Sequence, residues 1–306
     1  MRLLVVGAGA TGGYFGGRLA QAGRDVTFLV RPRRAQQLRE RGLEIVSPHG
    51  DVTVQPKLVT ADELTGHYDA ILLTVKSFGL QGALEDMSRA VGPQTVILPV
   101  LNGMRHVDVL RERFGAGAVG GCACKVMSAL DDRGRIVQIA KFQDLSYGEF
   151  DGQPSDRMQR LDRFMNGAGF DAQLSPTIER EMWEKWLFLA SLGGITCLMR
   201  GDTGSIEAAP GGRDFILKFF DEVTTVISTA GVPPSPSRRD AIRSQLIEKG
   251  ATWTSSMYRD LQQGLQIEAD AIIGDLLLRG RAVGVETPLL ATAYTHLSVY
   301  TSRLKN

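Results

Sequence analysis

The sequence contains little cysteine, almost no charge imbalance and no long apolar run, and each lack excludes a class of protein. Its 306 residues include three cysteines and no CxxC pair, so no disulfide framework and no metal site is predicted. The 35 Lys and Arg residues are balanced by 34 Asp and Glu residues, so no basic field favours nucleic acid as a partner. No stretch reaches the ~20 apolar residues of a membrane span. We therefore expect neither a nucleic-acid nor a membrane partner.

The start of the chain also lacks the features of a secretory signal. The apolar run from Leu3 to Val6 is much shorter than the core of a signal peptide, and it leads directly into a glycine-rich turn. Cys122 and Cys124 alternate with Ala123, which indicates one face of a short strand more than a redox pair. We therefore expect a reducing, cytoplasmic location.

The first half of the chain alternates short β-branched runs with stretches of helical periodicity. Four strands are predicted, at residues 2–6, 26–30, 70–75 and 95–100. This alternation is typical of a mostly parallel sheet covered by helices on both faces. The stretch GLEIVSPHGDVT at residues 42–53 predicts a hairpin inserted into the pattern. Three further strand-like runs follow Gly115, namely AVGGCACKVM, RIVQIA and LSYGEF.

From Ser175 onward the periodicity is helical and strand patterns disappear. Ser175 and Pro176 are predicted to be the N-cap and a first-turn proline of the first helix. Helices are predicted over residues 176–192, 214–230, 237–249, 255–278 and 288–304. We therefore predict an α/β domain over residues 1–174, with an N-terminal Rossmann-type doubly wound sheet, and an all-helical C-terminal domain over residues 175–306.

A glycine-rich turn follows the first predicted strand. In MRLLVVGAGATGG, the motif Gly7-x-Gly9-x-x-Gly12 stands between this strand and a predicted helix. The first glycine permits a tight turn, the second lets the backbone approach a pyrophosphate, and the third lets the helix pack on the strand. Because a second strand follows, the pattern predicts a dinucleotide site. The residues predicted to contact the cofactor here are Gly7, Gly9, Ala10, Thr11 and Gly12.

The end of the second predicted strand indicates which dinucleotide binds. In a protein that prefers NAD, an Asp or Glu at this point accepts hydrogen bonds from the ribose 2′-hydroxyl. Here the strand ends in VRPRR, which places Arg31 at that point, with Arg33 or Arg34 as assisting cations. Because a guanidinium suits a 2′-phosphate, NADPH is predicted over NADH.

A lysine interrupts the apolar face of the first predicted helix of the second domain. The stretch EMWEKWLFLASLGG covers residues 181–194, and its helix carries apolar residues at helical spacing, namely Ile178, Met182, Trp186 and Leu189. Lys185 falls on this stripe. Its amine either snorkels to solvent, pairs with an anion, or is desolvated and donates a proton near neutral pH.

Several motifs recur in one order along almost the whole chain. They are GAGATG at residues 7–12, TVKS at 74–77, LNGM at 101–104, the helix with Lys185, SSM at 255–257, IEAD at 267–270 and GVETP at 284–288. Together they resemble the ketopantoate reductases (2-dehydropantoate 2-reductases). The resemblance implies an NADP-binding Rossmann domain joined to a helical catalytic domain, and an NADP-dependent oxidoreductase that acts on CH–OH groups.

The resemblance also implies roles for individual residues. Lys185 resembles the family's general acid, which protonates the ketone oxygen as hydride arrives from the nicotinamide. Asn102 matches an asparagine that lies near nicotinamide and substrate and contacts this lysine, and Lys76 matches a cofactor-side lysine. Ser256 matches a serine that donates a hydrogen bond to substrate, and Glu268 matches a catalytic carboxylate near the reacting centre. A carboxylate there is suited to hold the amine of Lys185 in place. On one ideal helix Ser256 and Glu268 would lie ~120° apart, so a bend near Gly264 is expected if both serve one pocket.

Three positions depart from the family pattern. Leu189, Gly193 and Trp253 stand where the family usually carries asparagines. A site without such polar donors discriminates less well for a polar substrate. The leading prediction is reduction of ketopantoate to pantoate, a step of pantothenate biosynthesis, and the alternative is a bulkier or more apolar 2-oxo acid.

Two further alternatives stay open at this point. One is a non-catalytic NADPH-binding sensor, which is disfavoured because Lys185, Asn102, Ser256 and Glu268 are all present. The other is dehydrogenation of a hydroxy acid with NAD, which Arg31 disfavours. The expected partner is a small-molecule 2-oxo acid, and the prediction allows for a homodimer.

Overall fold

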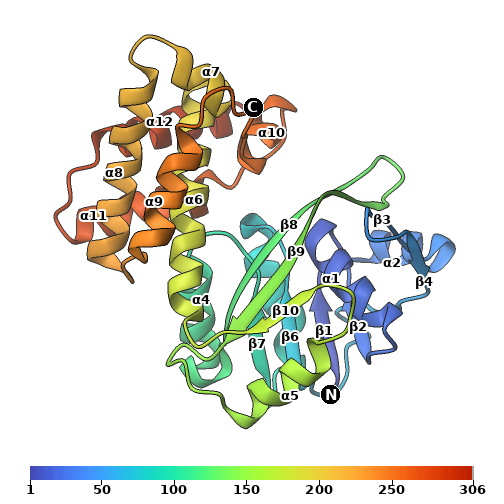
Figure 1. Cartoon of the computed structure of the whole chain (residues 1–306). Helices are drawn as coiled ribbons and strands as arrows, with labels where there is room; N and C mark the ends of the chain where they lie inside the picture. Colours follow the sequence, from blue (N-terminus) through green and yellow to red (C-terminus); the bar gives the residue numbers. More distant parts are fainter. Residues whose placement is uncertain (305–306) are drawn as a thin grey trace. The chain divides into compact units, whose positions relative to one another are not determined.

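The computed structural model describes residues 1–304, which divide into two units (Figure 1). The first unit consists of Met1–Leu101 and His106–Ile178, and the second of Asn102–Arg105 and the chain from Glu179 onward. A four-residue segment from the first half of the sequence therefore belongs to the second unit. Across residues 1–304, no helix is long and apolar enough to cross a membrane, and no cluster of His, Cys, Asp and Glu side chains is suited to a metal ion.

A five-stranded parallel sheet forms the centre of the first unit. Its strands are β1 (Leu3–Val6), β2 (Val26–Leu29), β5 (Lys57–Val59), β6 (Ala70–Leu73) and β7 (Val96–Pro99), in the order β5-β2-β1-β6-β7. All four predicted strands are confirmed, whereas β5 escaped prediction because its three residues are half-buried or exposed. The strand order reverses direction beside β1, which is the switch point at which such sheets bind ligands. The predicted Rossmann-type sheet is confirmed.

A second sheet of the first unit mixes parallel and antiparallel pairs. Its strands are β3 (Leu43–Val46), β4 (Val52–Val54), β8 (Gly121–Leu130), β9 (Ile136–Gly148) and β10 (Asp171–Leu174), in the order β10-β9-β3-β4 with β8 paired to β9. The predicted hairpin is the antiparallel pair of β3 and β4. The two predicted runs at 135–140 and 145–150 are one strand, β9. Residues 139–142 leave its ladder opposite β8, which interrupted the alternation in the sequence.

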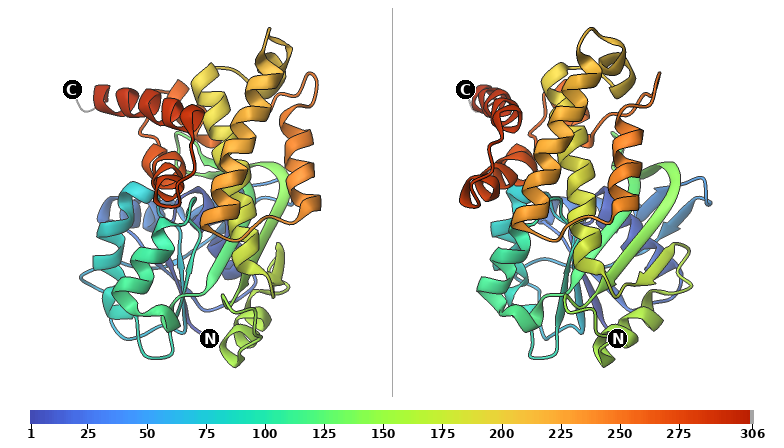
Figure 2. Two further views of the ribbon diagram at one scale, coloured as in Figure 1. Left: turned by 90° about the vertical axis from the view of Figure 1, so that its left-hand side faces the viewer. Right: turned by 60° about the vertical axis from the view of Figure 1, so that its left-hand side comes forward.

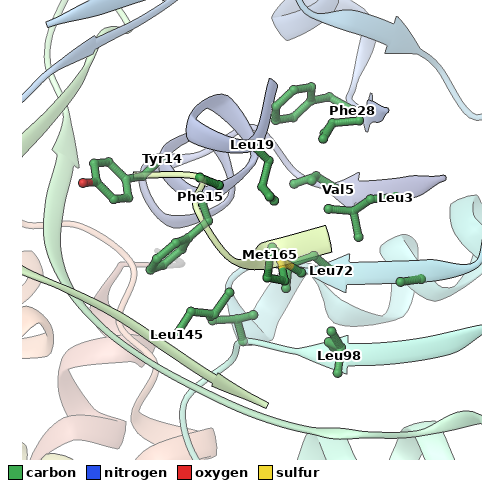
Figure 3. Close-up of a cluster of buried hydrophobic side chains, with 14 of the residues drawn as sticks. Leu3, Val5, Tyr14, Phe15, Leu19, Phe28, Leu72, Leu98, Leu145 and Met165 are labelled. Carbon is green, nitrogen blue, oxygen red and sulfur yellow. The ribbon is translucent and has the colours of Figure 1, made fainter. Parts of the chain in front are cut away.

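Helices and a shared core complete the first unit. Its helices are α1 (Ala10–Gln21), α2 (Pro32–Arg41), α3 (Leu80–Met87), α4 (Arg105–Phe114, whose first residue belongs to the second unit) and α5 (Asp156–Met165), with 3₁₀ turns at Ser77–Gly79, Ser88–Ala90 and Ala116–Ala118. Helix α1 contacts strands of both sheets. Its Phe15 and Leu19 are fully buried in one cluster with Leu145 of β9 and Met165 of α5 (Figure 3). This packing fixes the start of α1, where the glycine-rich turn ends.

The second unit is helical. It contains α6 (Ile178–Met199, whose first residue belongs to the first unit), α7 (Thr203–Ala208), α8 (Gly212–Ala230), α9 (Pro236–Leu246), α10 (Ser256–Gln262), a π-helix (Asp270–Gly274), α11 (Asp275–Ala282) and α12 (Pro288–Arg303). Helix α8 contacts α7, α9, α11 and α12, and the bundle is drawn from yellow to red in Figure 2. Residues 179–304 contain no β-strand, so the predicted helical character of this part is confirmed.

Three helix predictions were wrong in their bounds. The helix predicted over 237–249 ends at Leu246, as α9, and the other two differ because of a glycine. The predicted helix over 255–278 is interrupted, since α10 ends where Gly264 has a φ of +69° and Leu265 N–H donates to Asp260 O, a helix-terminating pattern. This is the expected break near Gly264. Helix α6 instead continues past Gly193 and Gly194 to Met199, because glycines without a left-handed φ do not stop a packed helix.

The start of α6 and a short helix also differ from prediction. Ser175 Oγ accepts a hydrogen bond from Thr177 N–H, but α6 begins at Ile178, two residues later than predicted. Helix α7 was missed because GDTG reads as a breaker. Its first residue is preceded by Asp202, whose carboxylate accepts from Ser205 N–H at 2.7 Å and caps the helix.

Candidate active site

The glycine-rich turn joins β1 to α1 in the first unit. Gly7 has a φ of +96°, and Gly9 is the extended N-cap of α1. A Cβ added at Gly9 would meet no atom within 4 Å, so space remains beside its backbone. A Cβ added at Gly12 would collide with Thr74 Oγ1 and Gly7 O. Because α1 leaves its first N–H groups, from Ala10 onward, without intrahelical acceptors, this end of the helix is suited to a pyrophosphate.

Thr74 holds this turn in place, a role that the sequence analysis missed. Its Oγ1 lies 2.9 Å from both Val6 O and Gly7 O, directly after β6. Thr74 is the first residue of the TVKS motif, in which only Lys76 was predicted to have a role. Lys76 is exposed and precedes the 3₁₀ turn Ser77–Gly79.

The arginines after β2 differ in their surroundings. Arg31, the N-cap residue of α2, is exposed, and so is Arg33. Arg34 is half-buried, and its guanidinium donates to Ala8 O in the glycine-rich turn at 3.2 Å and to Gly134 O at 3.0 Å. Burial lowers the pKa of Arg34 from its ordinary value. Arg34 therefore supports the turn, and the side chains of Arg31 and Arg33 are accessible to a ligand phosphate.

Lys185 lies at the edge of the apolar stripe of α6. Ile178, Met182 and Trp186 are buried, whereas Lys185 and Leu189 are half-buried. Residues four apart share a helix face, so Lys185 is followed on its face by Leu189. Lys185 as a whole is thus partly accessible, beside the buried residues of its helix.

Asn102 and Glu268 are brought together although 166 residues separate them in the sequence. Asn102 Nδ2 donates to Glu268 Oε2 at 3.4 Å, and Glu268 is only 8% exposed. Gly103 has a φ of +83°, and a Cβ there would collide with Ala271 O of the π-helix. The LNGM segment therefore packs directly against the chain that follows Glu268. The resemblance implied an Asn102 contact with the lysine, and the hydrogen bond found here is to the predicted catalytic carboxylate.

The two serines of the SSM motif have different positions. Ser256 is the exposed first residue of α10. Ser255 is its buried N-cap, which accepts from Tyr258 N–H at 2.9 Å and lies 3.2 Å from Thr196 Oγ1 of α6. Thr196 and Ser255 thus fix the start of α10 on the lysine helix, and Ser256 is presented from that start. Neither Thr196 nor Ser255 was predicted to have this role.

The three positions that depart from the family pattern offer no polar side chain. Two carry the apolar residues Leu189 and Trp253, and the third is Gly193, beside which the space is filled. A Cβ added at Gly193 would lie 2.9 Å from Met257 Cε, so the buried Met257 side chain occupies the space beside this glycine. Trp253 is 36% exposed, and its backbone carbonyl accepts a hydrogen bond from Thr203 N–H at 3.1 Å. Together with half-buried Leu189, these residues give the lysine helix and the start of α10 an apolar character.

Comparison with known proteins shows the family of the chain. The model of the family ketopantoate reductase PanE/ApbA matches residues 3–152, and that of the ketopantoate reductase PanE/ApbA C terminal matches residues 177–301. The uncharacterized oxidoreductase YkpB of Bacillus subtilis (strain 168) is 36% identical over 300 residues, which are 98% of this chain and 99% of that protein. The chain belongs to the ketopantoate reductase family.

Solved structures share the fold over the full length. The 2-dehydropantoate 2-reductase of Geobacter metallireducens GS-15 superposes with a TM-score of 0.87 at 26% identity, covering 98% of this chain and 99% of that one. A D-mandelate dehydrogenase bound to NADH and anilino(oxo)acetate has a TM-score of 0.87 at 20% identity, covering 100% of both chains, and shows a shared fold. The family comprises 2-dehydropantoate 2-reductases, oxidoreductases acting on CH–OH groups. The chain is therefore an oxidoreductase with a nicotinamide cofactor.

Proposed function

We propose that the protein reduces a 2-oxo acid to a 2-hydroxy acid with NADPH, with ketopantoate as the leading substrate. The observation that carries this proposal is the hydrogen bond between Asn102 and Glu268, which brings two residues of the family pattern together in the unit that also holds Lys185. Ketopantoate as substrate would place the protein in pantothenate biosynthesis in the cytoplasm. A homodimer stays a prediction, which light scattering would test.

Carbonyl reduction requires a hydride at carbon and a proton at oxygen. A reduced nicotinamide, when bound, would supply the hydride. The ammonium group of Lys185 first stabilises the negative charge that develops on the oxygen, and it then donates a proton to that oxygen. Glu268, which accepts a hydrogen bond from Asn102, holds the Lys185 amine in place. Ser256 donates a hydrogen bond to substrate. The glycine-rich turn belongs to the first unit and Lys185 to the second.

NADPH is proposed over NADH because of the arginines after β2. Arg31 is exposed at the end of the strand that follows α1, where the 2′-position of the adenosine ribose is read in such folds. Arg34 is held by Ala8 O and Gly134 O, so Arg31 is the stronger candidate for a 2′-phosphate. Gly9 and the start of α1 are the groups proposed to hold the pyrophosphate.

A second candidate substrate class is a 2-oxo acid with a larger or more apolar side chain. The observation that favours it is the packing of Met257 beside Gly193, in a region where the family pattern places an asparagine. Leu189 and the partly exposed Trp253 supply no carboxamide at the two other positions. A pocket lined in this way binds by apolar contact and loses little when a substrate hydroxyl is missing.

One pair of substrates separates the two candidates. Ketopantoate and 3,3-dimethyl-2-oxobutanoate have the same carbon skeleton, but only ketopantoate carries the terminal hydroxyl. NADPH oxidation is followed with each, and with phenylpyruvate and benzoylformate as aromatic 2-oxo acids. If the pocket recognises the hydroxyl, kcat/KM for ketopantoate exceeds that of the analogue by about 10³-fold or more, whereas an apolar pocket gives a ratio below about 10. Absence of turnover with all four would overturn the proposed function.

A further inference from the structure

One buried indole connects the helix of Lys185 with the segment that follows Glu268. Trp186 is the residue after Lys185 and is only 1% exposed. Its Nε1–H donates to Ile272 O at 2.9 Å, and Ile272 lies in the π-helix that begins two residues after Glu268. This hydrogen bond therefore joins the two chain segments that carry the proposed proton donor and the predicted catalytic carboxylate.

The segment that accepts this hydrogen bond is a π-helix. Asp275 N–H donates to Asp270 O, one residue further back than in an α-helix. Such single π-turns are rare and are found frequently at functional sites, because they change the carbonyl positions of an otherwise regular helix. On another side of this turn, Ala271 O faces Gly103, which allows no side chain at that position. The turn is therefore fixed by Trp186 and by the segment that carries Asn102.

We propose that Trp186 is a positioning residue for the reduction: its indole N–H holds the π-turn so that Glu268 and Asn102 keep their places relative to Lys185. This inference rests on the proposed function of Lys185. Trp186 itself reacts with nothing and acts through Glu268. Removing the N–H leaves Ile272 O without its side-chain donor in a buried setting, which the π-turn can relieve by shifting.

Trp183 provides a matched control on the same helix. It is 4% exposed, its ring centroid lies 5.3 Å from that of Trp186, and the Arg279 guanidinium is 5.7 Å from both ring centroids. Within residues 1–304, however, the Trp183 Nε1–H has no hydrogen-bond acceptor. Trp183→Phe and Trp186→Phe therefore remove the same atoms from neighbouring buried sites, and only Trp186→Phe breaks a hydrogen bond.

The first test compares the kinetics of the two variants with the best 2-oxo acid of the wild type. Trp186→Phe is expected to lower kcat about tenfold, to leave the KM for NADPH unchanged, and to displace the pH profile of kcat/KM. Trp183→Phe should keep kcat within about twofold and keep the profile. If Trp186→Phe does not fold, Trp186→Tyr, which keeps a large ring without the indole N–H, serves in the same comparison.

A second measurement does not depend on activity. Hydrogen–deuterium exchange of the backbone amides at residues 268–276 should be faster in Trp186→Phe than in Trp183→Phe or the wild type. If the wild type reduces no 2-oxo acid, the proposed function fails, while the exchange still reports whether Trp186 holds the π-turn. Two outcomes would overturn the positioning role of Trp186. One is equal exchange in Trp186→Phe and Trp183→Phe, and the other is faster exchange in Trp186→Phe with unchanged kcat and pH profile.

Discussion

Gly193 determines how closely Met257 packs against α6, and its replacement by alanine gives a signed prediction. In a helix interior, Gly→Ala alone stabilises by about 1 kcal/mol. Here the added Cβ would lie 2.9 Å from Met257 Cε, too close for two carbon atoms, so the thioether must move. Overpacking of this kind costs about 1–3 kcal/mol, and a flexible methionine keeps the cost moderate. We expect a net destabilisation of about 1 kcal/mol.

The control for this prediction is the same substitution beside a smaller neighbour. Met257→Ala by itself should cost about 2–5 kcal/mol, because it removes a buried side chain. In that background Gly193→Ala meets no thioether and should stabilise by about 1 kcal/mol, so its effect changes sign. The coupling between the two sites is therefore expected to be about 2 kcal/mol, within the range for residues in contact.

Tryptophan fluorescence is a suitable assay for the cycle. The protein has three tryptophans, at positions 183, 186 and 253, and all belong to the second unit. Urea unfolding followed by their emission therefore reports on the unit that contains the substitutions, even if the two units unfold separately. The packing argument is refuted if Gly193→Ala already stabilises the wild-type background by about 1 kcal/mol, as helix propensity alone predicts.

Three further predictions concern the first unit. Arg31→Ala should raise the KM for NADPH and not that for NADH, and an unchanged ratio of the two would contradict the assignment of Arg31 to a 2′-phosphate. Thr74→Val, which removes the hydroxyl near Gly7 O, should raise the NADPH dissociation constant measured by fluorescence, and unaltered binding would show that the turn holds without it. For Glu149, burial raises the pKa, but hydrogen bonds from Arg157 and Ser155 outweigh burial and hold the pKa below its ordinary 4.5. The contribution of Glu149 to stability is therefore present above about pH 5 and lost as pH falls through the lowered pKa. The difference in urea stability between wild type and Glu149→Gln should shrink on acidification. A difference independent of pH would exclude this cause.

Much of the fold was predictable because local patterns and packing agree. The strands β1 and β6, LLVV and AILL, are buried throughout and read as apolar runs, and the glycines between β1 and α1 gave a turn with a known physical reason. The end of α6 was not predictable locally, because only Met257 and Phe219 beside Gly193 and Gly194 show why a Gly-Gly pair continues a helix.

The residues of the candidate site stay predictions made by residue type, and the sequence did not predict the contacts among them. The proximity of Asn102 and Glu268 depends on packing between segments far apart in sequence, which no spacing rule gives. Ser255 and Ser256 are identical in chemistry, and only the start of α10 separates the buried cap from the exposed hydroxyl. The hydrogen bond of Trp186 ends in a π-turn, which has no pattern of its own in the sequence.

The central claim is that Lys185 donates the proton in NADPH-dependent reduction of a 2-oxo acid. The most direct test measures NADPH oxidation by the wild type and by Lys185→Gln with the 2-oxo acid that the wild type reduces best, together with NADPH binding by each protein. We expect Lys185→Gln to bind NADPH as the wild type does and to lose about 10²-fold or more in kcat. A variant that retains kcat within about threefold of the wild type would contradict the assignment of Lys185 as the general acid.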